Sequence, residues 1–251
     1  MENKKISLVL LIRNDYATCM HSFNQYGIER RRPPSEFMEE EGPYSLFVGD
    51  MEVELHVGLV TDSDPRLIEF FNDYATQARV FSKYKNNAQI FNELFRKCTG
   101  DYVCVLRPNM YLQKNWLLEL FFYNKVVLNS GVVGIASSFL NTEYAPVLST
   151  EDKFINVFID NDTTIDTCGV LCFQRQHLYN VGALDEREEL AGHEFYQFQK
   201  RAHYLGLLNY YIPTQTSICL QTSILGHDEK LLFAVASLEE MKERKNYYLP
   251  L

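Results

Sequence analysis

The sequence lacks the features that mark membrane-spanning and nucleic-acid-binding proteins. No apolar run among its 251 residues is long enough to cross a bilayer, because Glu119, Asn124 and Lys125 interrupt the longest apolar region, residues 117–140. Basic residues are in the minority: 24 Lys and Arg against 33 Asp and Glu leave a formal net charge of −9. This balance argues against binding nucleic acid through bulk positive charge. We interpret the basic run at residues 30–32 as a solvated loop.

Paired cysteines are also lacking. The six cysteines are scattered, and most stand within apolar runs, where a free thiol behaves as a small hydrophobic group. Cys168 and Cys172 are the only close pair. Their spacing on a predicted strand is too wide for both to hold one metal ion easily, and no second Cys/His pair completes a zinc site. We expect reduced thiols and a cytoplasmic protein, either free or peripheral to the membrane.

The N-terminal segment does not have the pattern of a signal peptide. Its apolar run, residues 6–12, is short, and no small-residue cleavage site follows it. A continuous apolar run of this length is typical of a strand buried on both faces. We therefore expect residues 6–12 to be the first strand of the core.

The first half of the chain predicts an α/β fold. Apolar residues make up 46% of the sequence, enough for a sizeable core. Strands are expected at residues 6–12, 53–60, 78–81, 102–106 and 132–136. Helices between them are expected to begin near residues 14, 65, 86 and 115, and this alternation predicts a mostly parallel sheet. Residues 30–50 are expected to form a long loop that contains a short strand at 44–48.

The second half has a different pattern. Strands are expected at residues 154–159, 168–173, 208–212 and 217–220, the first two joined by a polar hairpin turn. Helices are expected at residues 192–205 and 228–244. No repeat, low-complexity segment or clear linker interrupts the chain. We predict one domain, residues 1–251, built from a half of residues 1–136 and a half of residues 137–251.

The segment from residue 85 to residue 112 is the most informative part of the sequence. It predicts an amphipathic helix, a glycine turn and a buried strand, followed by the polar tripeptide Arg107-Pro108-Asn109. Active sites of open α/β sheets lie at such strand ends. Polar turns also follow the first two expected strands, at Arg13 and at Asp62. We expect these strand ends to meet around one pocket.

Several of these patterns occur in the order seen in family 2 glycosyltransferases of the GT-A fold. They include the turn after Val60, the run Gly100-Asp101-Tyr102, the block from Val181 to Glu186 and the helix entry Gly192-His193-Glu194. Over about residues 5–215 the chain resembles this family. The resemblance implies a GT-A fold with a nucleotide-binding half at residues 1–136 and an acceptor half at residues 137–251 that ends in the C-terminal helix. It also implies hexosyl transfer from a nucleotide sugar, with inversion.

The resemblance implies a role for each candidate site residue. The residues implied to bind nucleotide are Arg13, Asp62, Asn86, Arg107 and Asn109. Glu194 stands where the family has its catalytic base, which deprotonates the acceptor hydroxyl. Asp62 has a competing interpretation as part of a helix start, and Glu194 as an acidic residue favoured in a first helical turn.

The family's paired metal-binding aspartates are replaced in this sequence by Arg107 and Asn109. A divalent cation neutralises the diphosphate leaving group in such enzymes. Arg107 disfavours Mg²⁺ or Mn²⁺ at this position, and its guanidinium is able to contact the diphosphate directly. We therefore expect no metal ligand here. Two interpretations stay open, transfer without a tightly bound metal and a site that has lost transfer.

Other residues have simpler interpretations. Asp64 is expected to cap a helix, and Asp160 and Asp162 to stand in a turn. His227 is interpreted as a helix-entry residue, and the single Trp116 as part of the core.

Three functions remain as hypotheses. The first is a glycosyltransferase whose acceptor is a glycan, a lipid-linked molecule or a protein. The second is an inactive GT-A domain that serves as a nucleotide-, glycan- or protein-binding scaffold. A nucleotidyltransferase ranks third, because the turn after residue 12 lacks the glycines that such enzymes use. Neither the donor sugar nor the oligomeric state follows from the sequence.

Overall fold

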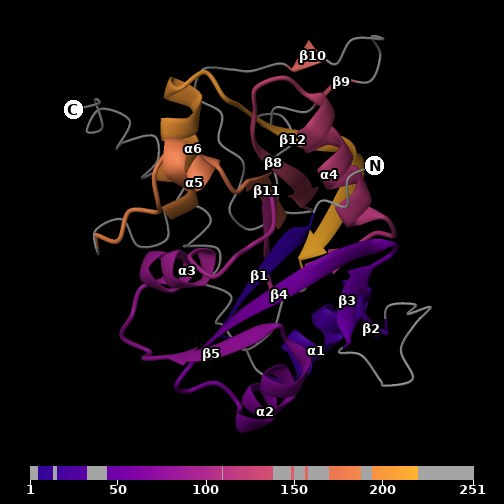
Figure 1. Cartoon of the computed structure of the whole chain (residues 1–251), viewed down its shortest axis with the longest axis vertical. Coiled ribbons are helices and arrows are strands. Elements are labelled where there is room, and N and C mark those ends of the chain that lie inside the picture. The colour runs from indigo at the N-terminus through magenta and orange to yellow at the C-terminus, as the bar shows by residue number, and fades with distance from the viewer. Residues whose placement is uncertain are drawn as a thin grey trace, which may run out of the picture. The chain divides into compact units, whose positions relative to one another are not determined.

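The computed structural model describes residues 5–13, 16–32, 44–108, 110–137, 148–149, 156–157, 170–187 and 194–219, all within one compact unit, Met1–Leu220 (Figure 1). The described strands form a ten-stranded mixed sheet in the order β2-β3-β4-β1-β6-β11-β8-β12-β7, with β5 paired to β4. They are β1 (Ile6–Ile12), β2 (Ile28–Arg31), β3 (Ser45–Val48), β4 (Met51–Val60), β5 (Gln77–Phe81), β6 (Tyr102–Leu106), β7 (Met110–Leu112), β8 (Ser130–Ser137), β11 (Val170–Gln174) and β12 (Leu208–Cys219).

The centre of the sheet is parallel and combines both halves of the chain. β1 lies between β4 and β6 and runs parallel to both. β11 comes from the second half, yet it lies between β6 and β8 and runs antiparallel to both. The predicted α/β class with a mixed sheet is confirmed. The two halves share one sheet because a second-half strand is inserted between two first-half strands.

Helices cover both faces of the sheet because successive strand residues face opposite ways. Leu8 belongs to a core packed with α1 (Tyr16–Gln25), α2 (Pro65–Tyr74) and α4 (Trp116–Val126). Its neighbour Val9 belongs to the opposite core, with α3 (Asn87–Phe95) and α6 (Glu194–Tyr204). Both side chains are fully buried. Burial of an aliphatic side chain of this size contributes about 1.5–3 kcal/mol relative to exposure.

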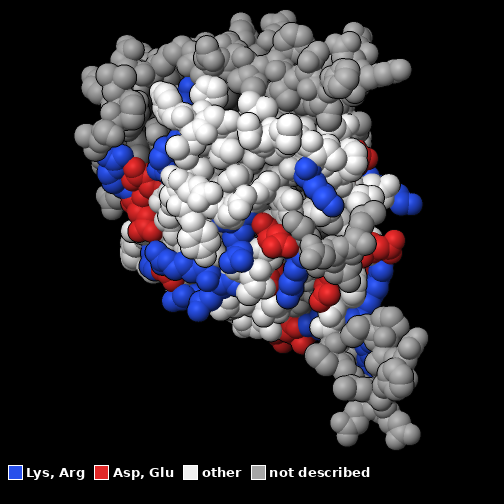
Figure 2. Space-filling view, turned by 45° about the horizontal axis from the view of Figure 1, so that its top comes forward, with Lys and Arg blue, Asp and Glu red and all other residues white. Residues whose placement is uncertain are grey.

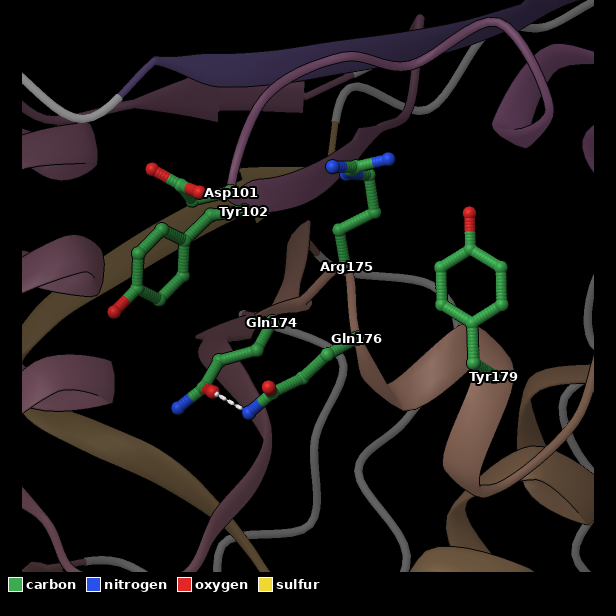
Figure 3. Close-up of a pocket in the computed structure, with 6 residues that line it drawn as sticks. All are labelled: Asp101, Tyr102, Gln174, Arg175, Gln176 and Tyr179. Carbon is green, nitrogen blue, oxygen red and sulfur yellow. Dashed lines mark hydrogen bonds between the residues drawn. The ribbon is translucent and has the colours of Figure 1, made fainter.

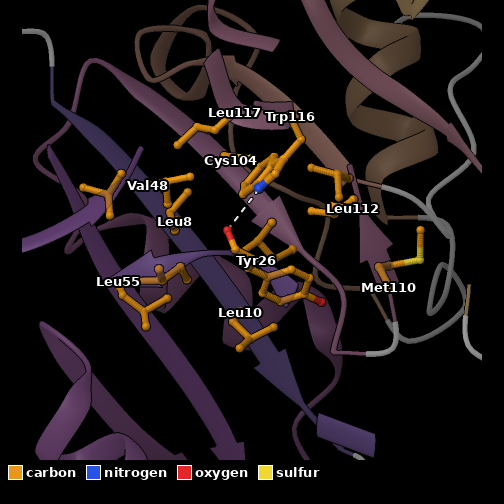
Figure 4. Close-up of a cluster of buried hydrophobic side chains, with 14 of the residues drawn as sticks. Leu8, Leu10, Tyr26, Val48, Leu55, Cys104, Met110, Leu112, Trp116 and Leu117 are labelled. Atoms are coloured by element: carbon orange, nitrogen blue, oxygen red, sulfur yellow. Dashed lines mark hydrogen bonds between the residues drawn. The ribbon is translucent and has the colours of Figure 1, made fainter. Parts of the chain in front are cut away.

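Trp116 lies in the core, as predicted, and is 2% exposed. Its indole N–H donates to the backbone carbonyl of Tyr26 at 3.1 Å, and the two rings meet edge to face (Figure 4). Tyr26 in turn donates its hydroxyl to the backbone carbonyl of Arg107. The buried pair therefore fixes the backbone at the end of β6.

A glycine before β6 permits a close approach of two chain segments. A Cβ added at Gly100 would lie 2.7 Å from the backbone oxygen of Lys5 and 2.7 Å from the backbone nitrogen of Ser7. No side chain fits such a gap. The run Gly100-Asp101-Tyr102 is thus explained by packing of the turn against the start of β1.

Three local predictions are corrected. Residues 28–31 form β2, paired with β3, where a loop was expected. β12 is one strand where two were expected, and its register shifts between Ile212 and Thr216, across a proline that cannot donate to the ladder. The hairpin predicted for residues 154–173 is wrong, because β10 (Asn156–Val157) pairs with β9 (Leu148–Ser149) while β11 joins the main sheet.

Three short elements, β7, β9 and α5 (His177–Asn180), were not predicted. The helix predicted at residues 228–244 lies outside the described residues, and the prediction of one domain over residues 1–251 stays a prediction. Within the described ranges, no helix has the length and apolar character needed to cross a bilayer.

Candidate functional site

The register of the parallel strands brings three predicted residues to one edge of the sheet. Ile12 on β1 pairs with Leu59 on β4, and Leu10 pairs with Leu106 on β6. Arg13, Asp62 and Arg107 follow the carboxyl ends of these strands by one or two residues. We call this edge of the sheet the carboxyl edge. The name covers these three residues and also Glu194, which is described below.

Arg13 is the central charge of the carboxyl edge. Its Nε donates to Asn87 Oδ1 at 3.0 Å and its Nη2 donates to the backbone carbonyl of Lys85 at 2.9 Å, so the guanidinium is held against the start of α3. Burial lowers the pKa of Arg13, and the carboxylates of Asp62 and Glu194 act in the opposite direction. Both carboxylates therefore lie close enough to Arg13 to interact with its charge.

Glu194 reaches this edge from the second half of the chain. It is the first residue of α6 and is buried, at 5% exposure. The N-terminal turn of a helix favours a negative charge. The buried carboxylate of Glu194 therefore belongs to the carboxyl edge, where its charge acts on Arg13.

The two aspartates after β4 have different surroundings. Asp64 caps α2 as predicted: its carboxylate accepts from the backbone N–H of Arg66 at 2.9 Å, and the Arg66 guanidinium pairs with it at 2.7 Å. Asp62 is exposed. Asp62 is the member of the pair whose carboxylate faces solvent and the charge of Arg13.

Arg107 is half-buried at the end of β6. Its backbone carbonyl accepts the hydroxyl of Tyr26. Within the described part of the chain, its guanidinium makes no hydrogen bond or ion pair. The Arg107 backbone is therefore fixed, and among the described residues its guanidinium has no polar partner.

The side chain of Asn86 makes hydrogen bonds to neighbouring backbone groups. Its side chain accepts from the backbone N–H of Gln89 at 2.9 Å and forms a capping box at the start of α3. Its amide also donates to the backbone carbonyl of Glu186 at 2.8 Å. Both polar groups of Asn86 are engaged, so this side chain joins α3 to the segment before α6.

Asn92 was missed by the sequence analysis. It is buried on α3, donates to the carbonyl of Leu184 at 2.8 Å and accepts from the Leu184 N–H at 3.0 Å. Its amide also reaches Glu186 Oε1 at 2.8 Å. The signal in the sequence was an asparagine on the apolar stripe of a helix. The Asn92 side chain joins the block from Val181 to Glu186 to α3 through these hydrogen bonds. It therefore helps to place the segment that leads to α6.

The remaining sequence candidates lie outside the described residues. These are Asn109, His193, Asp160, Asp162 and His227. Their predicted roles stay predictions.

Two cavities lie at the opposite edge of the sheet. One has a volume of about 180 Å³ and is lined by residues that include Asp101, Tyr102 and Arg175 (Figure 3). The other, of about 490 Å³, is lined by residues that include Lys5 and Glu54. Asp101 and Lys5 immediately precede β6 and β1, so both cavities belong to the amino edge of the parallel strands. The pocket expected at the carboxyl edge stays a prediction.

Charged side chains do not gather into one basic patch on the face that Figure 2 shows, where basic and acidic residues lie interspersed. Two residues of the basic run at 30–32 pair with acidic residues. Arg30 pairs with Asp73 at 3.2 Å, and Arg31 pairs with Glu29 at 2.6 Å.

The described residues of the carboxyl edge do not form a metal-binding group. Among all described residues, one group of His, Cys, Asp or Glu side chains is close enough together to hold a metal ion. It consists of Glu54, His56 and Cys98, at the amino edge. At the carboxyl edge, the residue that directly follows β6 is the cation Arg107. Divalent ions of the Mg²⁺ class bind carboxylate oxygens, so the guanidinium of Arg107 does not fit such an ion at the end of β6.

No family model and no curated protein matches the sequence. Solved structures do match the fold. Mannosyltransferase PcManGT from Pyrobaculum calidifontis, in complex with GDP-Man and Mn²⁺, has a TM-score of 0.66 at 10% identity over 99% of this chain and 66% of that one. GalNAc-T7 with UDP, GalNAc and Mn²⁺ has a TM-score of 0.57 at 11% identity over 88% of this chain and 44% of that one.

S. aureus TarS 1–349, in complex with UDP-GlcNAc, is also similar, with a TM-score of 0.55 at 13% identity over 87% of this chain and 59% of that one. The chain thus spans less than two thirds of the length of each of these structures. At such identities the likeness establishes the fold alone. The fold is that of GT-A glycosyltransferases.

Proposed function

We propose that the chain is a glycosyltransferase that binds a nucleotide sugar at the carboxyl edge and transfers the sugar to an acceptor hydroxyl with inversion. The observation that carries the proposal is that the carboxylates of Asp62 and Glu194 both act on the charge of Arg13, against the lowering of its pKa by burial. These three residues come from two strand ends and a helix start in different halves of the chain. Open α/β sheets bind their ligands at this edge.

The chemistry assigns each residue a role. Asp62, being exposed, accepts a hydrogen bond from the nucleotide base, and the guanidinium groups of Arg13 and Arg107 bind the diphosphate. Glu194 takes the proton of the acceptor hydroxyl. The acceptor oxygen then bonds to the anomeric carbon from the side opposite the diphosphate, the bond from that carbon to the diphosphate oxygen breaks, and the nucleoside diphosphate leaves.

Arg107 sets the expected metal dependence. Two of the similar structures were solved with Mn²⁺. In this chain a fixed positive charge stands at the corresponding strand end, and we propose that it neutralises part of the leaving-group charge without a tightly bound metal. Asn109 is proposed to add an amide contact to the same group. Asn86 is proposed to act on the nucleotide through its placement of the loop before α3.

The second candidate function is an inactive GT-A domain that binds nucleotide, glycan or protein as a scaffold. The observation that favours it is also Arg107, because loss of the metal-binding aspartates is one route to loss of transfer. A scaffold that binds nucleotide differs from the transferase in turnover alone, whereas a scaffold that binds only glycan or protein differs in nucleotide binding as well. Both therefore need separate tests of binding and of transfer.

The binding test compares nucleoside diphosphates and their sugars by calorimetry, with and without Mn²⁺ or Mg²⁺. We expect binding without metal, and we expect Arg107→Ala to weaken it by about 1.5–3 kcal/mol, the scale of a charged hydrogen bond. Arg96→Ala serves as the control, because Arg96 is exposed at the far end of α3. Binding that requires Mn²⁺, or that Arg107→Ala leaves unchanged, contradicts the proposed role of Arg107.

A further inference from the structure

A buried polar cluster lies at the amino edge, away from the proposed catalytic residues. Glu54 and His56 are two residues apart on β4, so both face α3, and Cys98 follows the end of that helix. One ligand atom from each of the three side chains lies within 4.8 Å of the other two. Their exposures are 3%, 3% and 4%. Carboxylate, imidazole and thiol are the three ligand types that zinc uses in proteins.

His56 is the unusual member of this cluster. Neither of its ring nitrogens has a hydrogen-bond partner among the described residues, although both are buried. A buried polar atom without a partner costs free energy and calls for an explanation. His56 Nε2 nevertheless lies 3.2 Å from Glu54 Oε1, without hydrogen-bond geometry. Two atoms that ligate one zinc ion at the tetrahedral angle are roughly 3.4 Å apart.

The surroundings of Glu54 resemble the outer shell of a metal ligand. The backbone N–H groups of Thr99 and Gly100 donate to its Oε1 at 2.5 and 3.0 Å, and the hydroxyl of Ser7 donates to the same oxygen. The Thr99 hydroxyl donates to Oε2 at 2.7 Å. Carboxylates that bind metals are usually fixed by such hydrogen bonds. They orient Glu54 before any ion arrives.

A cavity at the amino edge reaches one member of the cluster, Glu54. Glu54 and Lys5 line the cavity of about 490 Å³, whose wall includes the exposed residues Tyr44 and Asp73. Lys5 Nζ lies 3.5 Å from Glu54 Oε2, and its side chain is 44% exposed. It can therefore turn toward solvent when a cation approaches.

We propose that Glu54, His56 and Cys98 form a binding site for a single zinc-type divalent ion. The ion joins β4 to the turn between α3 and β6, and it gives a ligand bond to His56, whose ring nitrogens make no hydrogen bond. Binding displaces the thiol proton of Cys98 to solvent, because the thiolate is the ligand. The site lies at the edge opposite Arg13, Asp62 and Glu194, so its ion takes no part in the proposed transfer. The proposal is independent of the proposed transferase function.

Cobalt(II) is the probe, because a cobalt–thiolate bond gives a near-ultraviolet charge-transfer band that nitrogen and oxygen ligands do not give. The full chain, stripped with a chelator and kept reduced, is titrated with Co²⁺ alone, and Zn²⁺ is then added. We expect one equivalent of Co²⁺ to produce the band and Zn²⁺ to remove it. A wild-type protein without the band overturns the proposal.

Matched variants assign the band. Cys98→Ser is expected to abolish it, while Cys19→Ser, which changes an equally buried thiol on α1, is expected to keep it. Retention of the band in Cys98→Ser contradicts the site. If Cys98→Ser does not fold, the Zn²⁺ affinity of His56→Phe tests the site instead. This substitution is expected to weaken Zn²⁺ binding by at least about 100-fold, the upper end of the loss from an outer-shell change, and unchanged affinity overturns the proposal.

Discussion

At the scale of single residues, the charges at the two edges of the sheet have different roles. At the carboxyl edge, Arg13 interacts with the carboxylates of Asp62 and Glu194. At the amino edge, Glu54 is surrounded by donors from β1 and from the turn before β6. If the carboxyl edge binds the nucleotide sugar as proposed, substitutions there should alter binding or transfer, whereas substitutions of Glu54 should mainly lower the stability of the fold.

Glu194→Gln tests the catalytic base. The substitution keeps the size of the side chain and removes its ability to accept a proton. If Glu194 is the base, the transfer rate should fall by about 10²–10⁴-fold, the usual contribution of general base catalysis. Affinity for the nucleotide, measured by calorimetry, should change little. A variant that keeps the wild-type transfer rate would show that Glu194 is only a helix-start residue.

Glu54→Gln tests the amino edge. Burial acts to raise the pKa of Glu54, but the contacts from His56, Ser7 and Thr99 outweigh it and hold this pKa well below its ordinary value of 4.5. Such a carboxylate stabilises the folded state above its unfolded pKa and loses this contribution as pH falls. We expect Glu54→Gln to lower the free energy of unfolding by about 2–3 kcal/mol at pH 7.

The difference between wild type and Glu54→Gln should shrink as pH falls below about 4.5, which urea titrations at several pH values measure. Glu52→Gln, at an exposed position on the same strand, is the control and should stay within about 0.5 kcal/mol of wild type. A difference that is independent of pH would contradict the assignment to the Glu54 charge.

At the scale of elements, α3 links the strand ends to the second half of the chain. Its cap, Asn86, bonds Glu186, and its buried Asn92 bonds Leu184. Its first residue, Asn87, holds Arg13. The helix is therefore the element that sets the distance between Arg13 and the block before α6.

Asn86→Ala is expected to destabilise the protein by about 1–2 kcal/mol, because it removes a helix cap and the bond to Glu186. Asn86→Asp keeps an N-cap acceptor and should lose less than half as much. Urea unfolding measures both. If Asn86 also contacts the nucleotide, Asn86→Asp should lower the affinity for nucleotide even under conditions where the variant is fully folded. An alanine variant as stable as wild type would contradict the cap assignment.

At the scale of the whole described unit, the sheet cannot be divided between the halves of the chain. β11 lies between β6 and β8, and β12 lies between β8 and β7. The first half alone would therefore leave edges of β6, β8 and β7 unpaired and would expose the apolar face that α6 covers. Unpaired strand edges promote association with other chains. Each half depends on the other for burial of its apolar surface.

A fragment of residues 1–137 is therefore expected to aggregate or to lack a cooperative unfolding transition. Circular dichroism during urea unfolding and size-exclusion chromatography measure this, with the chain of residues 1–251 as the control. A monomeric fragment that unfolds cooperatively would show that the first half is a domain by itself.

The sequence alone determined the features that depend on local periodicity. The apolar run of β1, the capping signal Asp64-Pro65, the start of α3 near residue 86 and the buried stripe of α3 were all predicted near their observed positions. These follow because strand and helix periods, and caps, are properties of neighbouring residues. The same periodicity placed Arg13, Asp62 and Arg107 after strand ends, and hence at one edge.

Only the tertiary structure decided the pairings between distant residues. The insertion of β11 between β6 and β8, and the contact of β10 with β9, depend on which surfaces bury one another, and no local signal encodes this. The approach of Glu194 to Arg13 and the meeting of Cys98 with Glu54 and His56 are of the same kind. Such contacts join residues far apart in the chain, because burial and electrostatics act through space and not along the sequence.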